Sequence, residues 1–173
     1  MMKPFGISAG RSLARCSFVF AIAGGTPMIA RAQGDQPPKP VAALTPGTAI
    51  YRASLEIDGK LVPLDMARTV KLEKGAWVVT EVTTMSNYVS IDSVVLDRKT
   101  LVPQRRVLRD PTLTMEVQFA GNTATGTITA RGQTRPISID MHGVLFADGP
   151  GSQDAIAALP LRTGYSAEFL NFD

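Results

Sequence analysis

Cysteine and histidine are almost absent from this sequence, with one residue of each among 173. The single cysteine, Cys16, excludes a disulfide within the chain and a metal site built from several thiolates. His142, the only histidine, leaves one imidazole for a catalytic triad or a multi-histidine metal site. The sequence therefore predicts no catalytic constellation, no metal and no cofactor, and His142 is expected to be an ordinary polar residue.

Long apolar runs are also lacking. The longest, Cys16 to Ala30, is interrupted at residues 24–27 by Gly-Gly-Thr-Pro and is shorter than the roughly 20 apolar residues of a membrane-spanning helix. Basic residues precede it, and Ala30-Arg31-Ala32 follows as a small-x-small peptidase site. Residues 1–32 are therefore predicted to be a signal peptide, cleaved after Ala32. We expect a periplasmic or secreted protein without a transmembrane helix after cleavage.

An excess of one charge sign is missing once this segment is removed. The full chain has 18 basic and 15 acidic residues. Cleavage removes Lys3, Arg11, Arg15 and Arg31 but no acid, which leaves 14 basic and 15 acidic residues. Aromatic residues make up only 6% of the chain, too few for a base-stacking platform. Nucleic acid is therefore not an expected partner.

The remaining residues suit one domain of ordinary size. Residues 33–47 contain four prolines and two glycines and are predicted to be a flexible, extended leader. Ordered structure is expected to begin near Thr48, so that residues 48–173 form one antiparallel β domain.

Alternation of apolar and polar residues dominates from Thr48 onward and predicts successive strands. The expected strands are separated by short turn sequences, including Asp58-Gly59, Gly121-Asn122 and Arg131-Gly132, which favour hairpins. Near the C-terminus, Ser152 is expected to cap a short helix that ends at Leu159. Residues 164–172 offer a last strand.

These elements predict a mainly β fold. The expected architecture is a single antiparallel, strongly curved sheet of about eight or nine strands in meander order, with one short C-terminal helix. Because one helix covers little of an apolar sheet face, the sheet is expected to curl into a barrel or half-barrel. The sequence leaves open whether that barrel closes.

The cleanest alternation lies in residues 112–119. It places Leu113, Met115, Val117 and Phe119 on one face of a strand. These four side chains are the candidate lining of an apolar ligand site, with ordinary core packing as the alternative interpretation.

Arginines form the sharpest charge cluster. Arg105 and Arg109 share a strand face, whereas Arg106 points to the other. Arg105 and Arg109 are therefore the candidate contacts for a phosphate or carboxylate group. The alternative is a solvated strand whose charges discourage edge-to-edge aggregation.

Carboxylate pairs give no comparable signal. Asp92 with Asp97, or Asp58 with Asp65, could serve as an acid and a base, but their spacing singles out neither pair. Turns explain Asp58 and Asp97. Asp92 is predicted to lie on the polar face of its strand, opposite an apolar face of valines and isoleucine.

Near the end of the chain, Leu159-Pro160-Leu161 and Gly164-Tyr165 follow the predicted hairpins. In this pattern the chain resembles secreted bacterial β-rich proteins of unknown function. In broad shape it is also similar to the half-barrel lipoprotein carriers of the bacterial envelope. That second resemblance implies a curved sheet around an apolar cavity, with less helical covering here than in the carriers.

The leading hypothesis is an exported binding or accessory protein whose concave sheet face accepts a lipid, another apolar molecule or an envelope protein. One alternative is a small outer-membrane β-barrel, which alternating strands also permit, although aromatic girdles are absent. The other alternative is an enzyme, for which the sequence offers no activated nucleophile.

Overall fold

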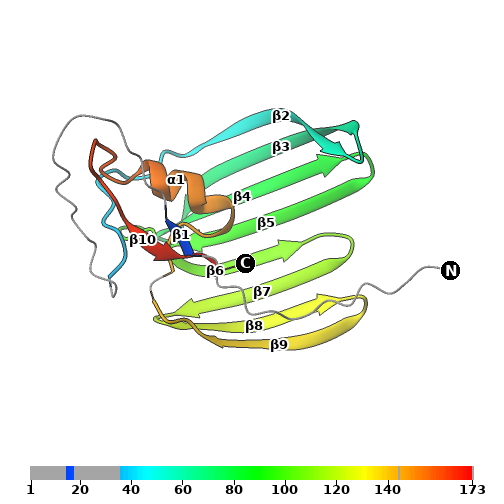
Figure 1. The fold of residues 1–173 in the computed structure, drawn as a ribbon. Helices are drawn as coiled ribbons and strands as arrows, with labels where there is room; N and C mark the ends of the chain where they lie inside the picture. Colours follow the sequence, from blue (N-terminus) through cyan, green and yellow to red (C-terminus); the bar gives the residue numbers. More distant parts are fainter. Residues whose placement is uncertain (1–14, 18–35, 144, 173) are drawn as a thin grey trace.

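The computed structural model describes residues 15–17, 36–143 and 145–172. Its main element is one eight-stranded antiparallel sheet in which every strand pairs with the next along the chain (Figure 1). The strands are β2 (Gly47–Ile57), β3 (Lys60–Glu73), β4 (Ala76–Met85), β5 (Tyr88–Leu96), β6 (Pro103–Arg109), β7 (Leu113–Ala120), β8 (Thr123–Ala130) and β9 (Gln133–Asp140). The prediction of a mainly β meander is confirmed, and the sheet is open, with β2 and β9 as its edges.

Two-residue turns fix the register of the hairpins. Asp58 and Gly59 have φ of 51° and 73°, and Arg131 and Gly132 have φ of 52° and 74°. Positive φ at both central residues gives the turn whose twist matches that of paired strands. The first turn therefore sets Ile57 opposite Lys60, and the alternation of β2 and β3 places their apolar side chains together.

Smaller elements lie outside the main sheet. They are β1 (Arg15–Ser17), the 3₁₀ helix η1 (Gly149–Gly151), α1 (Ser152–Ala157) and β10 (Glu168–Leu170). The short C-terminal helix is confirmed, but Gly151 rather than Ser152 is its N-cap, without a side-chain capping bond. The predicted last strand is reduced to β10, which pairs with β1 instead of joining the sheet.

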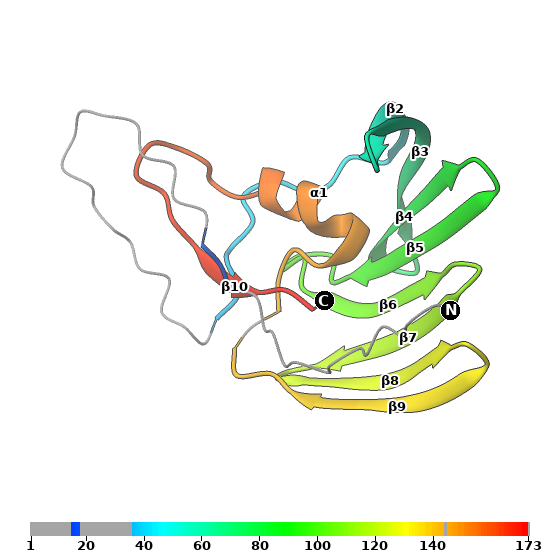
Figure 2. The ribbon, with the colours of Figure 1, turned by 45° about the vertical axis from the view of Figure 1, so that its right-hand side comes forward.

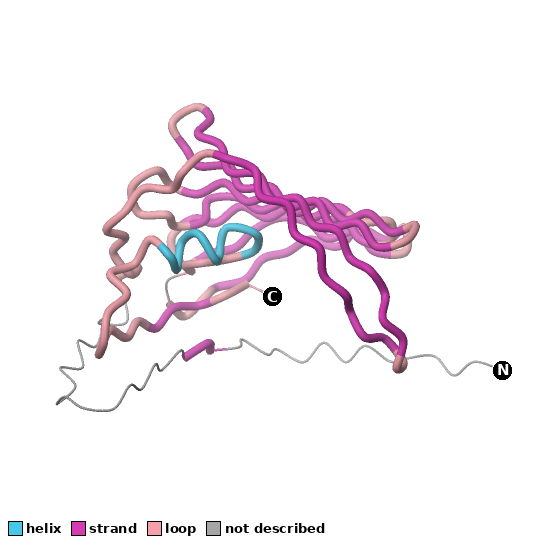
Figure 3. Tube along the Cα trace, turned by 90° about the horizontal axis from the view of Figure 1, so that it is seen from above, coloured by secondary structure: helices cyan, strands magenta, loops and turns pink. Residues whose placement is uncertain are grey.

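The sheet is bent around α1 and β10, which lie on its concave side (Figure 2). Both lie toward the strand ends where β3 passes to β4 and β5 passes to β6 (Figure 1). The opposite ends of the strands extend past this covering, and the β2–β3 hairpin projects away from the rest of the sheet (Figure 3). The concave face is thus covered along only part of its length.

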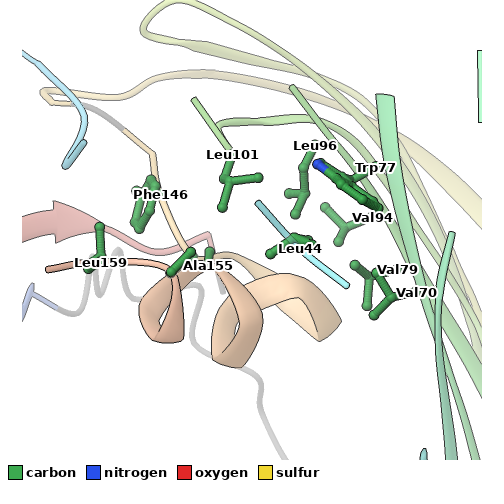
Figure 4. Close-up of a cluster of buried hydrophobic side chains, with 12 residues drawn as sticks. Leu44, Val70, Trp77, Val79, Val94, Leu96, Leu101, Phe146, Ala155 and Leu159 are labelled. Atoms are coloured by element: carbon green, nitrogen blue, oxygen red, sulfur yellow. The ribbon is translucent and has the colours of Figure 1, made fainter. Parts of the chain in front are cut away.

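The first core cluster lies between α1 and strands β3–β5. The sheet contributes Trp77, Val79, Val94 and Leu96. These side chains pack against Phe146 and against Ala155 of α1 (Figure 4). Burial of such large side chains supplies most of the stability of a sheet-on-helix contact.

The predicted leader takes part in this cluster. Leu44 is buried among its side chains, and the Val41 backbone N–H donates to the Ala158 carbonyl at 2.8 Å. Residues 36–47 are therefore packed against the fold through at least one side chain rather than serving only as a tether. Residues 33–35, and the predicted signal peptide except for β1, lie outside the described residues.

The second core cluster covers the concave face of β7 and β8. Met115, Val117 and Ala124 pack there against Met141, Leu145 and Phe172. The Phe119 and Phe172 rings meet edge to face, with centroids 5.4 Å apart. The C-terminal segment therefore fills this half of the concave face.

Among the described residues, no helix is both long and apolar enough to cross a membrane.

Candidate functional site

Charged side chains cross the concave face of four adjacent strands. The registers place Arg68 of β3 opposite Glu81 of β4, and Glu81 opposite Asp92 of β5. Arg106 of β6 lies opposite Val94, one pleat from Asp92. Directly opposed side chains on one face of a sheet are close enough to interact. The strand pairing alone therefore assembles a row of charged side chains across these four strands.

Arg106 connects this row to the segment that covers the sheet. Its Nε lies 3.2 Å from both Asp92 carboxylate oxygens, and its Nη2 lies 2.8 Å from Asp92 Oδ2. Its Nη1 donates to Asp148 Oδ2 at 3.2 Å and to the Phe172 carbonyl at 3.1 Å. All three guanidinium nitrogens thus have partners, so Arg106 acts as a clamp rather than as a site for an anionic ligand.

Asp148 is the most deeply buried member of this network, with no exposed surface. Besides Arg106, its Oδ1 accepts the Phe172 backbone N–H at 3.0 Å. Burial raises the pKa of Asp148, although Arg106 and the Phe172 N–H oppose that rise. The carboxylate is therefore held by two segments that are distant in sequence.

Arg68 ties α1 to the sheet in the same manner. Its Nη1 donates to Gln153 Oε1 at 2.6 Å, and its Nη2 pairs with the Asp154 carboxylate. The Arg68 side chain is 6% exposed, and its buried Nε makes no hydrogen bond within the described part of the chain. A buried guanidinium needs partners of this kind to offset desolvation.

A polar pocket of about 330 Å³ opens beside this network. Its lining includes Glu81, Asp92, Arg106, Ser152, Gln153 and Asn171. Burial raises the pKa of Glu81; Arg68 opposes this rise and Asp92 adds to it. Among the charged residues of the lining, two carboxyl groups, on Glu81 and Asp92, face one guanidinium group, on Arg106. The site is therefore acidic and suits a group that donates hydrogen bonds.

Beyond Glu81 the concave face is uncovered and largely apolar, and it also carries Thr83 and Ser90. Tyr51 and Leu55 of β2 are 43% and 48% exposed there, and the registers place them beside side chains of β3 and β4. We call this surface the open face. Its apolar side chains are those of Tyr51, Leu55, Val62, Leu64, Met66 and Met85. The concave surface thus has a polar pocket at its middle and an apolar floor leading away from it.

The four apolar residues singled out in the sequence do share the concave face of β7, but they differ in burial. Met115 and Val117 are buried and Phe119 is partly buried, all three against the C-terminal segment. Leu113 is half-buried and lines a shallow surface pocket at the strand end. Three of the four therefore occupy packed core.

The arginines are distributed as the alternation predicted, with Arg105 and Arg106 on opposite faces. Arg105 pairs with Glu116 at 2.9 Å on the convex face, where both side chains are well exposed. Arg109 is exposed at the end of β6. The structure does not bring Arg105 and Arg109 into the pocket, whereas Arg106 lines it.

Asp92 lies on the face opposite Val89 and Ile91, as predicted, but the prediction that its own face is polar was wrong. Asp92 shares the concave face with Val94 and Leu96, both fully buried, whereas Val89 and Ile91 are exposed on the convex face. Because β5 has apolar residues on both faces, its alternation did not show which side is buried.

The other singled-out polar residues stay apart from the pocket. Asp58 lies in a turn, and Asp65 pairs with Arg52 at the exposed edge. Asp97 accepts the Lys99 and Thr100 backbone N–H groups, which lower its pKa. His142 is exposed. Within the described ranges, no three His, Cys, Asp or Glu side chains gather as a metal site.

Sequence reasoning missed Glu81, Gln153 and the role of Arg106. One signal was available for Glu81. By alternation it shares a strand face with Trp77 and Val79, so it places a charge on an otherwise apolar stretch of that face. A charge on an apolar strand face indicates either a partner or a site.

Comparison with protein-family models, with curated proteins and with solved structures gives no match to this chain. The resemblance to lipoprotein carriers therefore stays a prediction.

Proposed function

We propose that the chain is an exported, non-catalytic binding protein for a lipid-like amphiphile, held on the concave face of the sheet. The apolar part of the ligand lies on the open face, and its polar end reaches the pocket at Glu81. The compartment assumed here is the one that the predicted signal peptide specifies, the periplasm or the exterior.

The observation that carries this proposal is the unequal covering of the concave face. The C-terminal segment fills the face over β7 and β8, whereas Tyr51 and Leu55 remain about half exposed on β2. Contiguous exposed apolar surface on one face of a soluble protein marks a binding site. Arg68 and Val62 are six residues apart on β3, which corresponds to about 20 Å along the strand. This length suits an extended hydrocarbon chain.

The charge of the pocket selects the polar end of the ligand. Arg106 has carboxylate partners on two sides, so an anionic headgroup would meet no free cation there. Glu81, whose pKa is raised by burial, accepts hydrogen bonds when ionised and gains from a nearby cation. An amine or hydroxyl headgroup therefore fits better than a carboxylate.

The test is calorimetric titration of the purified chain with monomeric dodecylamine, dodecanol and dodecanoate. We expect dodecylamine and dodecanol to bind more tightly than dodecanoate. Leu55→Asp should weaken dodecylamine binding at least about tenfold, since burying a leucine contributes about 1.5–3 kcal/mol. Dodecylamine, as a cation, should also bind more tightly than dodecanol, and this difference should be lost in Glu81→Gln, which removes the carboxylate.

Val89→Asp is the matched control, because Val89 is 44% exposed but lies on the convex face of β5. It should leave binding unchanged. Absence of binding by all three probes, or equal weakening by Leu55→Asp and Val89→Asp, would contradict the proposal.

A further inference from the structure

The edge strand β2 is unusually long, and its outer backbone groups have no partner strand in the described part of the chain. All of its eleven residues are exposed, and among the described residues no strand lies on its outer side. An exposed edge offers a row of unpaired backbone N–H and C=O groups to another strand. Globular proteins limit such edges by proline, bulges or short strands.

The two edges of the sheet differ in this respect. The edge strand β9 contains Pro136 within its eight residues, and proline cannot donate to an added strand. The β2 edge has no proline and shows exposed Ile50, Tyr51, Leu55 and Ile57. The protection present on one edge is therefore missing from the other.

The hairpin register shows which backbone groups of β2 face outward. The two-residue turn makes Ile57 and Lys60 a hydrogen-bonded pair, and hydrogen-bonded pairs alternate along an antiparallel ladder. The N–H and C=O groups of Thr48, Ile50, Arg52, Ser54 and Glu56 consequently point away from β3. These residues form the free hydrogen-bonding row.

We propose that β2 pairs with β2 of a second copy of this chain, antiparallel about a two-fold axis at Ser54. In this register Arg52 lies opposite Glu56 of the second copy, and Glu56 lies opposite its Arg52. The full-length overlap, centred on Arg52, would instead oppose two guanidinium groups. Opposite charges directly across a ladder stabilise it and like charges destabilise it, so charge complementarity selects the Ser54 register.

The same register also places apolar side chains of one copy opposite apolar side chains of the other. Tyr51 lies opposite Ile57 of the second copy, and Ala53 lies opposite its Leu55, all on the concave side. Antiparallel pairing leaves opposed residues on one face, so the dimer has one continuous sixteen-stranded sheet. Self-complementary contact of this kind is the usual geometry of a two-fold dimer. The proposal does not depend on a bound ligand.

Sedimentation velocity of the full chain over a range of concentrations tests this pairing. We expect a concentration-dependent monomer–dimer equilibrium, because a single strand pair buries little area. Arg52→Glu or Glu56→Arg alone should raise the dimer dissociation constant at least about tenfold, since each replaces two charge pairs between the copies by two repulsions. The double variant carrying both reversals should restore it to within about threefold.

Ser54→Pro supplies a second, independent arm. Because the Ser54 N–H points away from β3, proline there should leave the β2–β3 ladder formed and abolish the dimer; circular dichroism checks the folding. Arg131→Glu, in the turn at the opposite edge, is the control and should change nothing. A chain that stays monomeric at all concentrations, forms species larger than dimers, or dimerises equally in all variants would overturn the proposal.

Discussion

Arg106 is the side chain through which the sheet holds its C-terminal covering. It binds Asp92 within the sheet, and Asp148 and the Phe172 carbonyl outside it. Its side chain is only 15% exposed, so the ion pairs are sheltered from solvent screening. Such a network orients the covering segment because each charge would be unfavourable without its partner.

Arg106→Leu should therefore destabilise the protein by about 3–5 kcal/mol, because it leaves the carboxylate of Asp148 buried and unpaired. Urea unfolding followed by circular dichroism measures this change. Arg105→Leu is the matched control one residue away, where the pair with Glu116 is well exposed, and should change the stability by less than about 1 kcal/mol. Equal effects of the two variants would show that Arg106 is not a clamp.

At the scale of the elements, the strands were predictable because their signals are local. Alternation and the turns at Asp58-Gly59 and Arg131-Gly132 depend on neighbours in sequence, and the structure has strands and turns there. The site was not predictable in this way. The partners of Arg106 are 14, 42 and 66 residues away, and no periodicity encodes a contact of that separation.

Alternation also fails where both faces of a strand are apolar. In β5 the pattern gives no preference between Val94 and Ile91, yet the first is fully buried and the second 41% exposed. What decides is the position of α1 and η1, which lie over one face only. For the same reason, the sequence indicated an apolar face on β2 and β3 but not that it would remain uncovered.

The segment before β2 offers a prediction at this scale, since proline and glycine content indicated only an extended leader. Leu44→Ala should cost about 2–4 kcal/mol, because the leucine is 8% exposed within the first core cluster. Thermal unfolding measures the loss. Val41→Ala, at a side chain 69% exposed in the same segment, should stay within about 0.5 kcal/mol. If Leu44→Ala proved as mild as Val41→Ala, the segment would be only a tether.

The sheet is asymmetric in two respects: its concave face is covered over only part of its area, and only one of its two edges is protected. Both asymmetries have the same cause. A sheet of eight strands has more concave surface than one short helix and a C-terminal segment can cover. The chain places this covering over one end of the strands and over β7 and β8. The remaining surface, at the β2–β3 end, carries both the open face and the unprotected edge. Ligand binding and self-association are thus proposed for the same uncovered region.

The composition of the two core clusters also bears on the predicted signal peptide. Both core clusters, within the described part of the chain, are built from Leu44 and residues that follow it. Of the described residues before it, 15–17 pair only with β10, and an isolated two-stranded pair is marginally stable. A chain that begins at Gln33 should therefore unfold with the full chain's urea midpoint and show the same β signal by circular dichroism. Mass spectrometry of the protein recovered from exporting cells should show Gln33 as its first residue. A lower midpoint after truncation, or a recovered chain that retains residues 1–32, would instead make that segment part of the working fold.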